Sequence, residues 1–212
     1  MTLLLLIRHA RSTWNAAGRM QGQADPPLDE IGMQQAHTLG EFLRSETLHA
    51  IYTSPLVRAR ATAEAIARYH TAPLILDARL MERHLGEWTG LTGDEAKERY
   101  PEWLGRSWRS LGAPGGESQA ALTARVQAAL TDILAAHPDE TVAVVSHGGT
   151  LSSYLIHVLD FSLDQQISLG FENTAFARLS VRGAHVRLLS LGAAPLERAP
   201  IENPDFKSCG SL

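Results

Sequence analysis

Short apolar runs alternate with longer stretches of helical periodicity along most of this chain. Runs with the length of buried strands occupy residues 2–7, 49–53, 73–76 and 141–145, and helical periodicity occupies residues 29–45, 56–69, 118–136 and 150–159. Strand–helix alternation of this kind is typical of a parallel sheet with helices packed on both faces. We therefore expect an α/β protein, a three-layer α/β/α sandwich with a mostly parallel central sheet.

The last part of the chain departs from this alternation. Residues 175–181 and 185–191 are two strand-like runs around an Arg-Gly turn, which predicts an antiparallel hairpin. The 212 residues, 44% of them hydrophobic, suffice for one compact domain. We predict that this domain spans residues 1–191 and that residues 192–212, rich in proline and small side chains, form a loosely attached tail.

Residues 84–117 form the least regular stretch. Trp88, Trp103 and Trp108 lie there among glycines and prolines, a composition that suits an insertion covering a site. The tryptophans could line a partly apolar pocket, or they could anchor the insertion to the core. The sequence leaves both interpretations open.

The stretch at residues 29–45 shows how a helix of this chain is expected to start and which face it buries. Asp29 can cap its first turn, as Ser118 can for the 118–136 stretch. Its larger apolar side chains fall roughly on one face, which predicts that they pack on the sheet together: Ile31, Ala36, Leu39, Phe42 and Leu43.

Charge and cysteine content narrow the class of protein. The net charge of −4 and the pI of about 6.1 give no sign of a nucleic-acid or acidic membrane partner. The single cysteine, Cys209, excludes a disulfide within the chain and fits a reducing compartment. The apolar run at residues 3–7 is far shorter than the about 20 residues of a membrane span, and no basic segment precedes it as in a signal peptide. We expect a cytoplasmic protein, a monomer or a homodimer, that binds neither nucleic acid nor membranes.

Charged side chains follow several of the predicted strands. In open α/β sheets, ligands bind beyond the carboxyl ends of the strands. At those ends the chain places Arg8 with His9, then Arg58 one turn into the next helix, then Glu82, and finally His147 before two glycines. None of these residues is informative alone, but their coincidence at one predicted edge of the sheet indicates a site.

This set of side chains suits phosphoryl transfer. The transferred group passes through a loose transition state whose charge lies on three equatorial oxygens, so catalysis needs positioning and positive charge. Arginine supplies planar forks that match phosphate, and a neutral histidine can attack phosphorus. A carboxylic acid can protonate the leaving alkoxide and then deprotonate water. Gly148 and Gly149, at the start of a helix, expose backbone N–H groups to an anion.

The residues around these positions resemble the histidine phosphatase superfamily, the phosphoglycerate mutase-like proteins. The signature is Arg8-His9-Ala10-Arg11-Ser12-Thr13-Trp14-Asn15. The match continues in the same order through residues 19–22, 25–28, 32–36, 52–56, 58–59, 62–63, 82–90, 114–118 and 144–149. An Arg-His pair alone carries no information, whereas the ordered series is highly specific. The resemblance implies the phosphoglycerate mutase-like form of the predicted sandwich.

The resemblance also implies a role for each residue of the set. His9 would be the phosphorylated nucleophile, and Glu82 the proton donor. Arg8, Arg58 and His147 would hold the phosphate oxygens. Six further residues complete the predicted substrate-binding set: Arg11, Asn15, Gln21, Gly22, Arg83 and Gly148. The resemblance implies no metal and no cofactor, and no close cluster of His, Cys, Asp and Glu in the sequence has ligand spacing.

Two positions depart from the family pattern. Ala10 replaces the usual glycine after the nucleophile, and its methyl group is expected to tighten the pocket without abolishing it. Arg11 replaces the usual acidic or amide residue. Because Arg11 is close in sequence to Arg8, we expect it to add positive charge at the pocket entrance and to favour substrates with a second anionic group.

Three activities are compatible with the motifs. We favour a metal-independent phosphatase that acts through a phosphohistidine on a small phosphorylated metabolite, because residues 87–90 resemble the phosphatase branch. Residues 82–86 resemble a cofactor-dependent phosphoglycerate mutase instead. Mutases carry extra cations in the stretch that corresponds to residues 91–117, and Arg106 and Arg109 are a thinner substitute for them. A non-catalytic phosphate-binding or protein-interaction module is the third, and the complete set of catalytic side chains speaks against it. Candidate substrates are a sugar phosphate, a phosphoglycerate derivative or a nucleotide-like cobalamin precursor.

Overall fold

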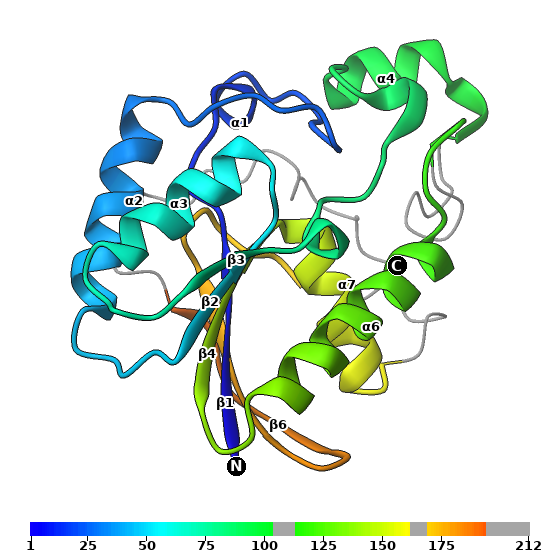
Figure 1. Cartoon of the computed structure of the whole chain (residues 1–212). Helices are drawn as coiled ribbons and strands as arrows, with labels where there is room; N and C mark the ends of the chain where they lie inside the picture. Colours follow the sequence, from blue (N-terminus) through cyan, green and yellow to red (C-terminus); the bar gives the residue numbers. More distant parts are fainter. Residues whose placement is uncertain (104–112, 162–168, 194–212) are drawn as a thin grey trace, which may run out of the picture.

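The computed structural model describes residues 1–103, 113–161 and 169–193, and its centre is a six-stranded sheet with the order β3-β2-β4-β1-β5-β6 (Figure 1). The strands are β1 (Thr2–Arg8), β2 (Ala50–Thr53), β3 (Leu74–Leu76), β4 (Thr141–Ser146), β5 (Phe176–Arg182) and β6 (His185–Ala193). The first four strands run parallel to one another, and β5 and β6 pair antiparallel at one edge. The prediction of a mostly parallel sheet with a late hairpin is confirmed.

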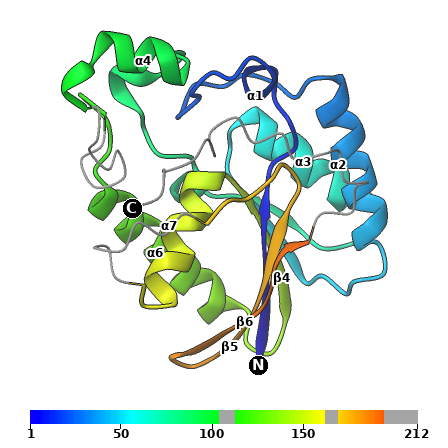
Figure 2. The same cartoon turned by 180° about the vertical axis from the view of Figure 1, so that it is seen from behind.

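Helices cover both faces of this sheet. The helices are α1 (Thr13–Ala16), α2 (Glu30–Leu43), α3 (Val57–Ala67), α4 (Gly93–Arg99), α6 (Gln119–Ala136) and α7 (Gly148–Val158), with the 3-10 turns η1 (Ala78–Leu80), η2 (Gly86–Trp88) and η3 (Pro101–Trp103). The two views agree that α2 and α3 lie on one face and that α6 and α7 lie on the other (Figure 1, Figure 2). This is the expected three-layer α/β/α sandwich.

The central strand β1 packs into both layers at once. Successive side chains of a strand point to opposite faces, so a strand covered on both sides has to be apolar throughout. Leu5 and Ile7 pack with the cluster that contains Leu39 of α2 and Ile66 of α3. Leu4 and Leu6 pack with the α6 and α7 side chains on the other face. The unbroken apolar run that predicted a buried strand therefore supplies the core of both layers.

The helix α2 begins at the predicted cap but buries a different face. The Asp29 carboxylate accepts a hydrogen bond of 2.7 Å from the Gly32 amide, as expected of an N-cap. Ala36, Leu39 and Leu43 are buried as predicted, but Ile31 and Phe42 are half exposed, so the prediction for these two was wrong. Gly32 and Gly40 take their places at the contact, because a Cβ there would lie 1.8 Å from the Arg11 carbonyl oxygen and 2.5 Å from that of Ala65. Periodicity of apolar residues does not detect a contact made by glycine.

The stretch at residues 84–117 contains more regular structure than expected. Thr92 starts α4 with a capping box, in which its hydroxyl accepts from the Glu95 amide at 3.2 Å while Glu95 accepts from the Thr92 amide at 2.8 Å.

The strand β6 continues to Ala193, so Gly192 belongs to the sheet edge and not to the predicted tail. Cys209 and the rest of that tail lie outside the described residues.

The carboxyl ends of the parallel strands meet at one edge of the sheet. Arg8 lies opposite Ser146 in the β1–β4 register, and Thr53 lies opposite Val145 in the β2–β4 register. Both views place α1 and α4 above this edge, and the N-terminus at the opposite end of the sheet (Figure 1, Figure 2). Within the described ranges, no helix combines the length and the apolar character that crossing a membrane requires.

Candidate active site

A cavity of about 440 Å³ opens at the carboxyl ends of the parallel strands. Nine of the eleven predicted site residues line it, and they come from six separate parts of the chain: Arg8, His9, Asn15, Gln21, Gly22, Arg58, Glu82, Arg83 and Gly148. The two that do not line it are Arg11 and His147. The structure thus brings together residues that the sequence assigned to the same edge of the sheet.

The side chain of His9 is buried at the floor of this cavity and is only 3% exposed. Its Nδ1 lies 2.7 Å from the carbonyl oxygen of Ala10. A carbonyl oxygen can only accept, so Nδ1 carries the proton and donates, and Nε2 keeps a lone pair. Burial first, and then the charges of Arg8 and Arg58, hold the pKa of His9 well below its usual value of 6.5. The ring is therefore neutral near pH 7.

The ring of His147 lies beside that of His9, with the two centroids 5.1 Å apart. Its Nε2 is 2.8 Å from the hydroxyl oxygen of Ser54, which itself accepts from the Leu56 amide at 3.3 Å. A Ser54 hydroxyl that donates to Nε2 corresponds to a neutral ring whose proton is on Nδ1. Nδ1 is buried and has no partner among the described residues. Burial, followed by the charges of His9, Arg58 and Arg8, lowers the pKa of His147 well below 6.5.

Two arginines supply the positive charge of the cavity. Arg58 is 1% exposed, and its Nη1 and Nη2 donate to the carbonyl oxygens of Ala24 at 2.7 Å and Gly22 at 2.8 Å. Arg8 Nη1 donates to the Phe171 carbonyl oxygen. Burial lowers the pKa of both guanidinium groups, that of Arg58 to about 10, so both remain charged at neutral pH. The Nε atom of each is buried without a partner among the described residues, and an anionic oxygen in the cavity would satisfy it.

The loop that follows α1 forms the wall around these arginines. Gly22 has a φ of +50°, and a Cβ there would lie 3.1 Å from the Leu85 Cβ and 3.2 Å from the Arg83 carbonyl oxygen, which is why only glycine fits. The Ser12 hydroxyl oxygen lies 2.8 Å from Gln21 Oε1 and 3.0 Å from Asn15 Oδ1, and Asn15 Oδ1 also accepts from the Ser12 amide at 3.2 Å. Asn15 and Gln21 are therefore fixed by hydrogen bonds of their own.

The Glu82 carboxylate sits at the N-terminus of α7. One oxygen accepts from the Gly149 amide at 3.1 Å, and the other accepts from the Thr150 amide at 3.0 Å and from the Thr150 hydroxyl at 3.1 Å. These bonds satisfy amides that have no partner within the helix, and they hold the carboxyl group of Glu82 in place. Because it also lines the cavity, Glu82 can exchange a proton with a molecule bound there.

Arg83 and Gly148 are the remaining predicted residues that line the cavity. Arg83 is 4% exposed, and its Nε donates to the Glu117 carbonyl oxygen at 2.8 Å. Burial lowers the pKa of Arg83, although the charges of Glu117 and Glu82 oppose that shift. Gly148 starts α7 close to Arg8, since a Cβ there would lie 3.6 Å from the Arg8 Nε.

The two departures from the family pattern point away from the cavity. Arg11 pairs with the Asp29 carboxylate, with Nε and Nη2 each 2.7 Å from Oδ2, and so it reinforces the cap of α2. The expectation that Arg11 adds charge at the pocket entrance is wrong, because the nearer carboxylate binds it. The Ala10 methyl group packs with Ala36 and Ala65 rather than against the cavity, so it does not tighten the pocket.

Sequence reasoning missed the far wall of the cavity. That wall combines apolar side chains with hydroxyl and amide groups: Met20, Leu85, Gln119, Leu122, Ser152, Ser153, Ile156, Leu169 and Phe171. Several of them lie on α6 and α7, beyond the motifs at residues 114–118 and 144–149 where these helices begin, so no recognised motif marked them. Trp88 is buried with Leu85 and Ala113 and does not line the cavity, which supports the anchoring interpretation for this tryptophan. The Trp103 side chain and Trp108, Arg106 and Arg109 lie outside the described part.

The cavity contains arginine and histidine groups where a metal site would need several carboxylate, thiolate or imidazole ligands together. Within the described ranges, no group of three or more His, Cys, Asp or Glu side chains could hold a metal ion. The chemistry of the groups present suits an anion.

Comparison with known proteins decides the family. The sequence matches the profile of the histidine phosphatase superfamily (branch 1) over residues 4–194. The chain belongs to this superfamily. The family resemblance and the enzyme class predicted from the motifs are thereby confirmed.

Several curated proteins are similar to this histidine phosphatase over most of its length. Phosphoserine phosphatase 1 of Hydrogenobacter thermophilus is 37% identical over 181 residues, which cover 84% of this chain and 85% of that protein. The metal-independent phosphoserine phosphatase of Arabidopsis thaliana is 39% identical over 76% of this chain and 71% of that protein. A probable phosphoglycerate mutase, GpmB of Photorhabdus laumondii, is 35% identical over 84% of this chain and 85% of that protein.

Solved structures share the fold of this histidine phosphatase. YhfR of Bacillus stearothermophilus has a TM-score of 0.83 at 36% identity, over 89% of this chain and 96% of that one. The match supports the phosphoglycerate mutase-like arrangement of the sheet and its helices, as predicted.

Proposed function

We propose that this histidine phosphatase hydrolyses phosphomonoesters of small metabolites without a metal, through a phosphohistidine formed on His9. The observation that carries the proposal is the state of His9: a neutral imidazole, with its proton held on Nδ1 by the Ala10 carbonyl, in a cavity lined by Arg8 and Arg58. A neutral ring with a free Nε2 lone pair is the form that can attack phosphorus.

The proposed reaction has two steps. In the first, Nε2 of His9 bonds to phosphorus while the bond to the leaving oxygen breaks, and Glu82 gives that oxygen a proton. In the second, the Glu82 carboxylate takes a proton from water, the water oxygen bonds to phosphorus, and the bond to His9 breaks. Arg8, Arg58 and the Nδ1–H of His147 neutralise the phosphoryl oxygens in both transition states. Asn15, Gln21, Gly22, Arg83 and Gly148 complete the proposed binding set.

Phosphoserine is the substrate that we propose to test first. Two relatives at 37% and 39% identity are named phosphoserine phosphatases, one of them metal-independent. Beyond the phosphate end, the cavity is lined by two more cations, Arg19 and Arg83, and by hydroxyl groups of Ser152 and Ser153. A carboxylate and an ammonium group could both find complementary partners there. The insertion at residues 84–117 contributes Leu85 to this part of the cavity, in keeping with its proposed role as a cover.

A cytoplasmic location and a monomeric or homodimeric state are part of the proposal, as is a single domain whose last strand is β6 (His185–Ala193). The single cysteine supports a reducing compartment. The cationic cavity supports a small anionic partner, and the net charge of −4 does not favour nucleic acid or acidic membranes.

A phosphoglycerate mutase activity is the second candidate, because one relative at 35% identity is named a probable phosphoglycerate mutase. The two activities differ in what accepts the phosphoryl group from His9. A phosphatase transfers it to water, whereas a mutase transfers it to a second hydroxyl group.

Release of phosphate from phosphoserine in the presence of EDTA tests the main proposal. We expect turnover that chelation leaves unchanged, and we expect His9→Ala to lose nearly all of it while remaining folded. His185→Ala, at the exposed start of β6 and outside the cavity lining, is the matched control. Rapid quenching with radiolabelled substrate is expected to trap an acid-labile label on the wild type and none on His9→Ala.

Three outcomes would overturn this proposal. Turnover that disappears with EDTA would refute the metal-free mechanism, and label bound to a residue other than His9 would refute the nucleophile. Interconversion of phosphoglycerate isomers that depends on bisphosphoglycerate, without release of phosphate, would favour the mutase.

A further inference from the structure

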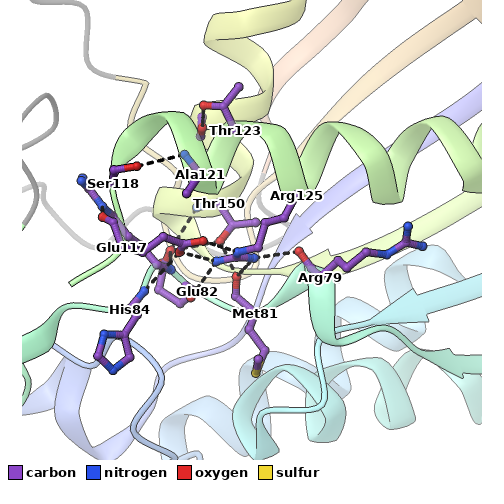
Figure 3. Close-up of polar contacts among 12 residues, drawn as sticks. Arg79, Met81, Glu82, His84, Glu117, Ser118, Ala121, Thr123, Arg125 and Thr150 are labelled. Carbon is purple, nitrogen blue, oxygen red and sulfur yellow. Dashed lines mark hydrogen bonds and ion pairs between the residues drawn. The ribbon is translucent and has the colours of Figure 1, made fainter. Parts of the chain in front are cut away.

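An arginine outside the recognised motifs binds the main chain of the segment that carries Glu82. The Arg125 Nη1 donates to the carbonyl oxygens of Arg79 at 2.7 Å and Met81 at 2.8 Å, and its Nη2 donates to that of Glu82 at 3.0 Å (Figure 3). Arg125 lies two turns into α6, so a helix on one face of the sheet holds a loop at its carboxyl edge.

The remaining donors of Arg125 bind one carboxylate. Its Nε donates to Oε1 of Glu117 at 2.6 Å, and its Nη2 donates to Oε2 at 2.8 Å. A guanidinium group has five N–H donors, and these five hydrogen bonds use all of them. The pair is mostly shielded from solvent, with side-chain exposures of 20% and 14%. An ion pair in that setting is screened much less than one on the surface.

Glu117 connects the same cluster to Arg83 and His84. Its carbonyl oxygen accepts from the Arg83 Nε at 2.8 Å, and its amide donates to the His84 carbonyl oxygen at 2.8 Å. The chain on both sides of Glu82 is therefore held, before it by Arg125 and after it by Glu117. Figure 3 shows Arg125 between the main chain at Met81 and Glu82 and the Glu117 carboxylate.

The carboxylate of Glu82 itself is held by α7 rather than by α6. Its partners there are the amides of Gly149 and Thr150 and the Thr150 hydroxyl, which also lies 2.9 Å from the Met81 carbonyl oxygen. The backbone of Glu82 is thus fixed to one helix and its side chain to the next. Any shift of the backbone relative to α7 would move the carboxylate within the cavity.

We propose that Arg125 and Glu117 are positioning residues that set the place of the Glu82 carboxyl group for proton transfer to the leaving oxygen. The inference rests on the proposed function, since it assumes that Glu82 is the acid. Neither residue lines the cavity, so neither contacts the substrate. A displacement of about 1 Å at a catalytic group costs up to about 100-fold in rate. Loosening the clamp that Arg125 and Glu117 form on the Glu82 segment should therefore lower the rate measurably.

The dependence of the rate on the leaving group separates this role from general support of the fold. A poor leaving group needs the proton, whereas a good one leaves without it. Phenyl phosphate and dinitrophenyl phosphate have the same ring but leaving groups of very different acidity. The quantity to compare is kcat/KM, because it reports the first phosphoryl transfer and is insensitive to the later hydrolysis.

Arg125→Lys is the first variant, because it keeps the charge but has only three donors. We expect kcat/KM for phenyl phosphate to fall about 10- to 100-fold, while that for dinitrophenyl phosphate stays within about threefold of wild type. Glu117→Gln, which leaves Arg125 in place, is the second variant and is expected to show the same selectivity with a smaller loss. It decides the question if Arg125→Lys does not fold.

Asp132→Asn is the matched control. Asp132 also joins α6 to the segment before Glu82, through its ion pair of 2.6 Å with Arg79, but it does so on the exposed surface and has no contact with Arg125. We expect it to leave both rates unchanged. Equal losses for the two esters in Arg125→Lys and Glu117→Gln, or no loss in either, would overturn the proposal.

Glu82→Gln distinguishes a failure of this inference from a failure of the proposed function. If Glu82→Gln loses activity selectively on phenyl phosphate and the two positioning variants do not, Glu82 is the acid and the clamp is refuted. If Glu82→Gln shows no selectivity, the proposed role of Glu82 is refuted, and the inference is refuted with it.

Discussion

Nδ1 of His9 lies 2.7 Å from the carbonyl oxygen of Ala10, the next residue in the chain. The partner that fixes the tautomer of His9 is therefore a backbone group, which does not titrate. A carboxylate in that place would raise the pKa of the ring and favour the charged form. The Ala10 carbonyl oxygen also raises the pKa of the ring, but its effect is smaller than the lowering by burial, and the neutral ring prevails.

The depressed pKa values of His9 and His147 predict how stability depends on pH. Below about pH 6.5 the unfolded chain binds protons at these histidines and the folded chain does not, so the free energy of unfolding falls as the pH drops. Above about pH 6.5 their contribution is complete and constant. The slope is at most about 1.4 kcal/mol per pH unit for each histidine.

Urea unfolding at about pH 7.5 and about pH 5.5 measures this effect. We expect His9→Asn to lose less stability between the two pH values than the wild type does. His185→Asn, at the exposed first residue of β6, is expected to behave like the wild type. Equal losses in all three proteins would contradict the assignment of neutral, buried rings.

The glycine at position 22 is predicted to matter for both backbone conformation and space. Gly22→Ala places a methyl group 3.1 Å from Leu85 at a φ of +50°, and the Gly22 carbonyl that anchors Arg58 would shift. We expect a loss of about 1–3 kcal/mol in stability and a fall of about tenfold in kcat/KM. Gly18→Ala is the control, because Gly18 has a φ of +63° with nothing within 4 Å of its would-be Cβ. Gly18→Ala should lose stability alone, and a matching loss of kcat/KM there would refute the close-approach argument.

Arg19 is predicted to take the role first expected of Arg11. It lines the cavity and is held at the rim by the Gly90 carbonyl oxygen at 2.6 Å and by Glu95 at 3.1 Å. Phosphoserine and phosphoethanolamine differ only by a carboxylate. We expect Arg19→Gln to raise the KM for phosphoserine about two- to fivefold and to leave that for phosphoethanolamine unchanged. Arg60→Gln, an exposed arginine paired with Glu64 on α3, is the control.

Ionic strength provides a second check on the role of Arg19. The charge of a rim arginine is screened by salt, so the difference between Arg19→Gln and the wild type should shrink as salt is added. An effect of equal size on the two substrates would show that Arg19 does not meet the carboxylate.

The ends of the strands could be located from the sequence, because buried parallel strands are continuous apolar runs followed by polar residues. Arg8, His9 and Glu82 were found in this way, and the cavity lies where the carboxyl ends of β1, β2 and β4 predicted it. The preference of Asp and Ser for the N-cap position also placed Asp29 and Ser118 at the starts of their helices.

Contacts between separate elements could not be read from local patterns. Ile31 and Phe42 were assigned to the buried face, but the backbone of α2 approaches Arg11 and α3 through Gly32 and Gly40, which leaves these two side chains at the surface. Arg11 was assigned to the pocket from its neighbours in the chain, whereas its partner in space is Asp29. The clamp formed by Arg125 is invisible for the same reason, since three of its five acceptors are main-chain oxygens that carry no sequence signal.

The Glu82 carboxylate closes the first turn of α7 through the amides of Gly149 and Thr150. A descendant of this chain that abandoned hydrolysis could not replace Glu82 freely, because two main-chain donors would lose their acceptor. Such a protein would be expected to keep glutamine or another acceptor at this position. An acidic residue surviving here is therefore a weaker sign of enzymatic activity than a surviving histidine at position 9.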